Sequence, residues 1–226
     1  DDQQGPAAAK FIINKAKPKK VAVLHDKQSY GQGIAASVRD ELKKANVDVA
    51  LFEGINAGDS DYSAVITKLK SAGADFVYYG GYHPEMGLLL RQAAEQGLKV
   101  RMMGPEGVGN PEINAIAGNA VEGMLVTLPA DPASKPENAA LVKAFKDKGR
   151  DPSGAFQMGA YTATQVLAQS IKAVGDDAEK VADYLHKTTF NMPTGNVAWD
   201  AKGDLKAFDF PVYSWHKDGS KSVAEK

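Results

Sequence analysis

Cysteine is absent from the 226 residues of this chain, and its absence removes three kinds of chemistry. Without it the chain forms no disulfide, holds no thiol nucleophile and offers no cysteine ligand to a metal. Only four histidines occur, at positions 25, 83, 186 and 216, and no two of them have the H-x-x-x-H spacing of a zinc site. The sequence therefore predicts no metal site and no cofactor.

Long apolar runs and an excess of one charge are also missing. No run approaches the roughly 20 apolar residues that cross a bilayer, so we expect no membrane insertion. With 27 basic and 28 acidic residues, the net charge of −1 indicates no general affinity for nucleic acid or anionic membrane. One short basic run, KAKPKK at 15–20, is typical of a solvated loop.

What is present is an alternation of strand and helix patterns along the first 128 residues. Apolar runs predict strands at 19–26, 47–54, 74–81, 99–104 and 121–128. The segments between them predict helices. Two carry apolar stripes, Ile34, Val38 and Leu42 in the first and Val65, Ile66 and Leu69 in the second, which Gly73 ends. Two further helices are predicted at 84–97 and 113–116. This rhythm predicts an α/β fold with a doubly wound parallel sheet and helices on both faces.

The rhythm changes after Leu128. Between Pro129 and Thr189 only helical periodicity remains, with three stripes marked by Leu141, Leu167 and Val181. The following tract, 195–220, alternates apolar and polar residues and predicts a hairpin or two edge strands. Three amphipathic helices need cover for their apolar faces. Either they pack on one another and on the edge of the first sheet, or their partner sheet lies outside this chain.

Two glycine-rich loops after predicted strands are the clearest functional signal. FVYYGGYHPEMG places Tyr82 beyond the third strand, and MMGPEGVGN places Glu106 beyond the fourth. Open α/β sheets bind small molecules at the carboxyl ends of their strands, and glycine lets the backbone approach a ligand closely. A single carboxylate framed by tyrosines suits a small amine better than a phosphate.

A competing pattern occurs in the first strand–helix connection. Gly31, Gly33 and Ala36 satisfy G-x-G-x-x-A, and Glu53 follows Gly33 by the 20 residues expected of a ribose-binding acid. This pattern favours a nucleotide-dependent α/β enzyme as the alternative. HDKQSY intervenes between Leu24 and Gly31, however, and so long a loop cannot form the tight turn of a dinucleotide site. No G-x-S-x-G elbow occurs, so we expect a protein without catalytic residues.

Six segments in the same order resemble one family. They are HDKQSYGQG, FVYYGGYHPEMG, MGPEGVGN, EGMLVTLP, DPSG followed by Phe156, and WDAKGDLKAFDFPVYSWHKDG. Together they resemble the branched-chain amino-acid (Leu/Ile/Val-type) periplasmic substrate-binding proteins of ABC importers. The resemblance covers essentially the whole chain.

The resemblance implies a type I periplasmic-binding-protein fold, in which two α/β lobes joined by three crossovers hold the ligand between them. Family members are longer, and this chain resembles them from just before the first crossover onward. It implies that residues 1–128 and 207–226 form the second lobe, and that 129–206 are the helical remainder of the first lobe. The amino-terminal part of the first lobe is expected to be missing, which would leave the helices uncovered.

The resemblance also implies a ligand site. Glu106 matches the acid that pairs with the ligand ammonium, Tyr30 and Tyr82 match this lobe's aromatic contacts, and Phe156 matches an aromatic of the other lobe. The implied function is periplasmic capture of a small aliphatic amino acid by hinge closure, with delivery to the membrane permease of an ABC importer. An incomplete lobe that assembles with another chain, or self-associates through the exposed remainder of the first lobe, is the structural alternative.

Overall fold

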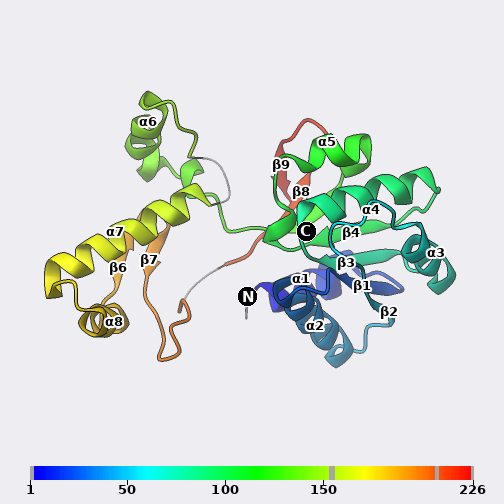
Figure 1. Cartoon of the computed structure of the whole chain (residues 1–226), viewed down its shortest axis with the longest axis horizontal. Helices are drawn as coiled ribbons and strands as arrows, with labels where there is room; N and C mark the ends of the chain where they lie inside the picture. Colours follow the sequence, from blue (N-terminus) through cyan, green and yellow to red (C-terminus); the bar gives the residue numbers. More distant parts are fainter. Residues whose placement is uncertain (1–2, 153–155, 207–208, 225–226) are drawn as a thin grey trace. The chain divides into compact units, whose positions relative to one another are not determined.

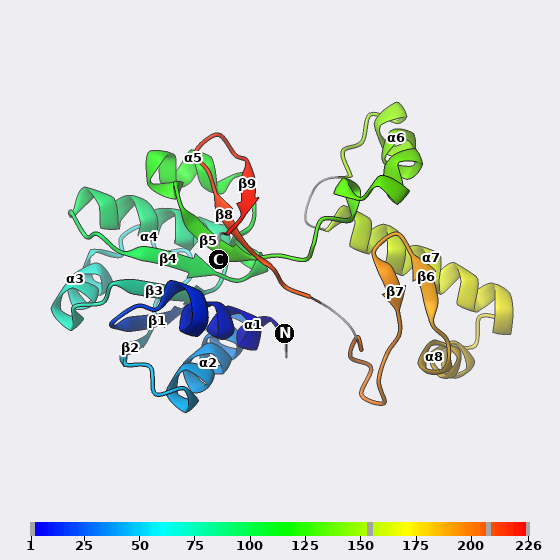
Figure 2. The same ribbon diagram turned by 180° about the vertical axis from the view of Figure 1, so that it is seen from behind.

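The computed structural model describes residues 3–152, 156–206 and 209–224, which fall into two compact units (Figures 1 and 2). One unit comprises Asp1–Leu128 with Phe210–Lys226, and the other comprises Pro129–Asp209. The chain therefore leaves the first unit after Leu128 and returns to it at Phe210.

The first unit is built on a seven-stranded sheet with the order β2-β1-β3-β4-β5-β8-β9. Its strands are β1 (Val21–His25), β2 (Val49–Gly54), β3 (Phe76–Gly80), β4 (Arg101–Gly104), β5 (Met124–Thr127), β8 (Val212–Trp215) and β9 (Lys221–Val223). The first five run parallel, while β8 pairs antiparallel with β5 and β9 antiparallel with β8. The predicted parallel sheet is confirmed, since all five predicted strands belong to it.

Helices cover both faces of this sheet (Figure 1). On one face lie α1 (Gln4–Phe11), continued by the π turn η1 (Ile12–Ala16), and α2 (Ser29–Lys44). The other carries α3 (Ser63–Ala72), α4 (His83–Glu95) and α5 (Ile113–Ala117), and the short turns η2 (Glu106–Val108) and η3 (Gly118–Val121) complete the unit. The predicted stripe of α2 is fully buried against β1 and β3, and Gly73 ends α3 at φ 67°.

The second unit contains three longer helices and a two-stranded sheet. Two short turns, η4 (Pro132–Ser134) and η5 (Pro136–Asn138), precede α6 (Ala139–Asp147), α7 (Gln157–Val174), α8 (Ala178–Lys187), β6 (Phe190–Met192) and β7 (Gly195–Val197). Its small core joins Val166 of α7 to Phe190 and Met192 of β6. Leu167 and Ile171 of the same helix remain 48% and 46% exposed, so the apolar stripe of α7 is only partly covered.

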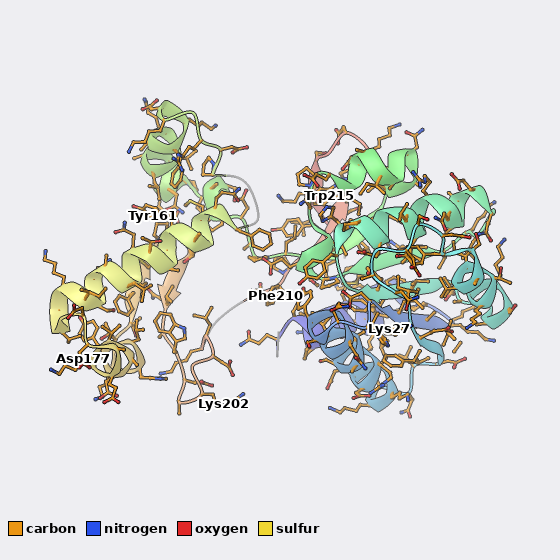
Figure 3. All side chains as sticks on the ribbon, in the orientation of Figure 1. Lys27, Tyr161, Asp177, Lys202, Phe210 and Trp215 are labelled. Atoms are coloured by element: carbon orange, nitrogen blue, oxygen red, sulfur yellow. The ribbon has the colours of Figure 1, made fainter. Side chains whose placement is uncertain are left out.

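Within the tract 195–220, Trp199 and Leu205 form an antiparallel bridge, as the predicted hairpin requires. The two strands of the tract, β7 and β8, do not pair with each other. Strand β7 pairs with β6, which precedes the tract, and β8 lies between β5 and β9 in the other sheet. Strand β7 meets β6 and β8 meets β9 across short turns, whereas the pairing of β5 with β8 joins distant parts of the chain. Strand β8 ends at Trp215, which is labelled in Figure 3. In the turn that follows, Asp218 accepts hydrogen bonds from the backbone nitrogen and hydroxyl of Ser220.

Candidate functional site

Three of the four predicted site residues lie at one edge of the large sheet. Tyr30 stands in the first turn of α2 after β1, Tyr82 caps α4 after β3, and Glu106 opens η2 after β4. Strand β3 lies between β1 and β4 in the sheet, and all three run parallel. Their carboxyl ends therefore point to the same edge, and the fold brings the three loops together.

The two tyrosines form an aromatic pair. Their ring centroids lie 5.5 Å apart with an interplanar angle of 39°. Tyr30 is half-buried, whereas Tyr82 is 47% exposed. The pair thus offers an apolar surface with one open side, which is what a ligand's aliphatic group requires.

Gly107 allows this pair to close over the Glu106 loop. A Cβ atom at this position would lie 2.7 Å from the carbonyl oxygen of Gly81. It would also lie 3.1 Å from a ring carbon of Tyr82 and 3.2 Å from one of Tyr30. A side chain here would separate the loops, so the glycine is required by close approach of backbone to backbone and not by an unusual φ angle.

Gln4 is a member of this cluster that the sequence did not single out. Its Oε1 atom accepts a hydrogen bond of 2.9 Å from the backbone nitrogen of Glu106 and a longer one of 3.4 Å from the Tyr30 hydroxyl. The side chain is 1% exposed at the start of α1. In the sequence this glutamine stands in a polar stretch without periodicity, and no local pattern links it to loops so distant along the chain.

The electrostatics of the cluster favour a positively charged ligand group. Burial raises the pKa of the Glu106 carboxyl above its ordinary value, and no ion pair among the described residues includes Glu106. Burial also raises the pKa of Tyr30 to about 12; a hydrogen bond with the Gly107 backbone opposes that shift and the nearby Glu106 charge adds to it. At neutral pH the site therefore combines a neutral phenol with a partly desolvated carboxylate, to which an ammonium group is complementary.

Phe156 belongs to the second unit. It caps α7 and is 60% exposed, and its backbone nitrogen donates to Oε1 of Gln157. The cluster of Tyr30, Tyr82 and Glu106 is complete within the first unit without it. The role of Phe156 as a ligand contact stays a prediction.

The glycines of the alternative nucleotide pattern lie inside a helix. Helix α2 begins at Ser29, so Gly31 and Gly33 occupy its first turns and do not form a strand-to-helix turn. A Cβ atom on Gly31 would lie 2.2 Å from Asp26 Oδ1 and 2.5 Å from the Gly80 carbonyl oxygen, whereas one on Gly33 would meet nothing within 4 Å. Gly31 therefore serves the packing of α2 on β3, and the geometry does not favour a dinucleotide site.

Two further searches cover the described residues. Across 3–152, 156–206 and 209–224, no group of three or more His, Cys, Asp or Glu side chains could hold a metal ion. No helix in the same ranges is long and apolar enough to span a membrane.

Comparison with known proteins identifies the class. The sequence profile of the family described as "Periplasmic binding protein" matches residues 1–220, and the chain belongs to that family. Its fold is the type I periplasmic-binding-protein fold. A crystal structure of a leucine-binding protein from Thermotoga maritima superposes with a TM-score of 0.89 at 31% identity, over 100% of this chain and 65% of that one.

Among curated proteins, the chain is similar to binding proteins for branched-chain amino acids. It is 58% identical over 223 residues to the leucine-, isoleucine-, valine-, threonine- and alanine-binding protein of Pseudomonas aeruginosa, covering 98% of this chain and 60% of that protein. It is 48% identical over 225 residues to the Leu/Ile/Val-binding protein of Escherichia coli, covering 100% of this chain and 61% of that protein. The chain thus spans about three fifths of the length of these relatives.

Proposed function

We propose that this chain is part of an extracytoplasmic protein that captures a small aliphatic amino acid of the branched-chain type. The captured amino acid is delivered to the membrane permease of an ABC importer. The protein acts by binding alone, without catalysis, and the proposed location is the periplasm. The names of the relatives in Pseudomonas aeruginosa and Escherichia coli support this ligand class.

The observation that carries the proposal is the partly buried carboxylate of Glu106 beside an aromatic pair. Burial raises the pKa of this carboxyl, so an arriving ammonium group compensates a desolvated charge through charge-assisted hydrogen bonds. The rings of Tyr30 and Tyr82, 5.5 Å apart, supply the apolar surface for the aliphatic side chain. The site thereby matches two parts of an amino acid, its ammonium group and its aliphatic side chain, but not its carboxylate.

The mechanism follows from the proposed division into lobes. Residues 1–128 and 207–226 act as the second lobe, and 129–206 as the helical remainder of the first. Phe156 adds an aromatic contact from that remainder. Ligand contacts made by both lobes exist only when the hinge is closed, so binding shifts the open–closed equilibrium toward the closed form.

The first lobe also supplies the contacts to the ligand carboxylate in this scheme. No segment of this chain matches them, so we expect the 226-residue chain alone to bind its ligand weakly or undetectably. A chimera tests this division, in which the chain is fused to the amino-terminal segment of the Pseudomonas aeruginosa relative that it does not match. Calorimetric titration of the chimera with leucine, isoleucine and valine should give a single site with micromolar or tighter affinity.

Two variants of the chimera locate the site. Glu106→Gln removes the charge but keeps the shape, and should weaken binding by at least about 30-fold, since an unpaired buried charge costs about 2 kcal/mol or more. The control is Glu137→Gln, at an exposed position of the second unit without an ion pair among the described residues, and it should leave affinity unchanged. A folded chimera that binds none of the three amino acids, or a Glu106→Gln variant with intact affinity, would refute the proposal.

A thermal-unfolding assay addresses the nucleotide alternative. ATP and NAD should leave the melting temperature of the chain unchanged, because Gly31 and Gly33 lie within α2. A concentration-dependent increase with either nucleotide would favour the enzyme reading over amino-acid capture.

A further inference from the structure

Seven basic side chains lie exposed at the edge of the large sheet opposite Tyr30, Tyr82 and Glu106. At this edge the strands begin and the preceding helices end. We call this group the amino-edge patch; its members are Lys15, Lys17, Lys19, Lys20, Lys70, Lys99 and Arg101. The basic run at 15–20 supplies four of them, and the fold adds three from elsewhere in the sequence.

Backbone pairing brings the strand-start members of the patch together. Phe76 aligns with Val21 on one side and with Arg101 on the other, so the starts of β1, β3 and β4 are adjacent. The backbone nitrogen of Asp75 donates to the carbonyl oxygen of Lys20, and Arg101 N donates to the Asp75 carbonyl oxygen.

Helix ends join the same surface. Nζ of Lys70, in the last turn of α3, donates to the carbonyl oxygen of Gln96 at the end of α4, three residues before Lys99. The Lys20 side chain reaches the end of α3, where its Nζ would lie 4.0 Å from a Cβ atom on Gly73. The patch therefore spans three strand starts and two helix ends.

The patch is short of negative partners. Among the described residues, none of the seven takes part in a salt bridge. The carboxylate of Asp75 accepts the backbone nitrogens of Lys19 and Lys20, both at 2.9 Å, and Asp48 lies at the rim, where its carbonyl oxygen accepts from Val21 N. Glu95, the last residue of α4, is the third acid at these helix ends and strand starts, and it pairs with Arg91. The remainder of the chain holds the other 20 of its 27 basic residues and 25 of its 28 acidic ones, so the charge is strongly asymmetric.

We propose that the amino-edge patch docks the protein on an anionic lipid surface. Protein–protein interfaces are enriched in aromatic residues, methionine and arginine and depleted in lysine, whereas six of these seven cations are lysines. None of the strongly exposed large hydrophobic residues among the described ones belongs to the patch. Flexible ammonium groups without fixed geometry match a fluid layer of lipid phosphates, which attracts each nearby Lys or Arg.

This orientation keeps the candidate ligand site free. The patch and the Tyr30–Tyr82 pair lie at opposite edges of one sheet in one unit, so an amino-edge contact leaves the carboxyl edge open. The proposal rests on charge and topology, and it holds whether or not the site binds an amino acid.

Vesicle flotation of the 226-residue chain tests the proposal. Wild type is mixed with vesicles of phosphatidylcholine containing 30 mol% phosphatidylglycerol, and in parallel with pure phosphatidylcholine vesicles. We expect binding to the anionic vesicles only, and a loss of binding as NaCl is raised, because salt screens exposed charges. The patch variant changes Lys15, Lys19, Lys20 and Lys99 to Gln, and its partition coefficient should fall at least about 20-fold.

A matched control changes four exposed lysines of the other unit to Gln, namely Lys146, Lys148, Lys172 and Lys180, with the same change in net charge. The control should bind the anionic vesicles as wild type does. A third variant, in which the four patch lysines are changed to Arg, keeps their charges and should also bind as wild type does. Circular dichroism melting confirms that each variant is folded. The proposal is overturned if wild type ignores anionic vesicles, if patch and control variants lose binding equally, or if soluble polyglutamate binds the patch as tightly as vesicles do.

Discussion

The rings of Tyr30 and Tyr82 lie 5.5 Å apart, and Gly107 occupies the space beside them. This contact joins the first turn of α2, which follows β1, to the start of α4, which follows β3, and the glycine belongs to the turn η2 after β4. A change at Gly107 therefore tests whether the three loops act as one site.

Gly107→Ala should open this cluster. Its Cβ atom would lie 2.7 Å from the Gly81 carbonyl oxygen, closer than a real side chain tolerates, so the backbone must shift. We expect a loss of about 1–3 kcal/mol in the free energy of unfolding, measured by urea denaturation, and weaker leucine binding in the chimera. Gly33→Ala is the control: nothing lies within 4 Å of its Cβ position inside α2, and alanine should stabilise the helix by about 0.5–1 kcal/mol. Equal effects of the two substitutions would contradict the role assigned to Gly107.

The raised pKa of Glu106 makes a prediction about stability and pH. Burial raises this pKa in the folded chain above the ordinary value of 4.5, so the folded state binds the proton more tightly than the unfolded state. The ionised carboxylate consequently destabilises the unliganded fold at neutral pH, and this cost disappears as the pH falls below 4.5. Glu106→Gln should therefore raise the melting temperature at pH 7 and leave it nearly unchanged at pH 4.

Calorimetric melting at both pH values checks that difference. The control Glu137→Gln, at an exposed position without an ion pair among the described residues, should show no such dependence. A Glu106→Gln variant that is less stable at pH 7 than the wild type would show that the carboxylate stabilises the free fold, against the argument from burial.

Gln4 should act as the support of the site. Gln4→Ala leaves the backbone nitrogen of Glu106 and the Tyr30 hydroxyl without this acceptor, and an unsatisfied buried donor costs about 1–3 kcal/mol. We expect a decrease of that size in unfolding free energy, and faster hydrogen exchange at the Glu106 amide. Gln32→Ala, at an exposed position of α2, should change neither quantity. Unchanged exchange at Glu106 in Gln4→Ala would remove Gln4 from the site.

The exposed stripe of α7 predicts self-association of the chain. Leu167 and Ile171 are 48% and 46% exposed and lie one helical turn apart, which leaves apolar surface in water. Sedimentation velocity should show concentration-dependent association, and the double variant Leu167→Gln, Ile171→Gln should reduce it. The comparison variant Val223→Gln changes a residue that is 65% exposed on the other unit, and should leave association as it is. A wild-type chain that stays monomeric at high concentration would refute this prediction.

The sequence by itself determined the order and kind of most elements. Strands such as Val21–His25 contain a continuous apolar run, here the first four residues. The stripe of Ile34, Val38 and Leu42 repeats with the helical period, and Gly73 ends a helix by its left-handed φ. These signals are local, since each depends on neighbours within a turn or a strand. The three loops around Tyr30, Tyr82 and Glu106 could be placed at one edge because parallel strands end on the same side of a sheet.

Only the tertiary structure decided which distant residues meet. Gln4 reaches Glu106 across 102 residues, and β8 joins β5 while β7 joins β6 in a separate sheet. Periodicity reports that a face is buried but not what buries it, so neither contact leaves a local pattern. The amino-edge patch has the same origin: a solvated run at 15–20 becomes a seven-cation surface only when crossovers bring Lys70, Lys99 and Arg101 beside it.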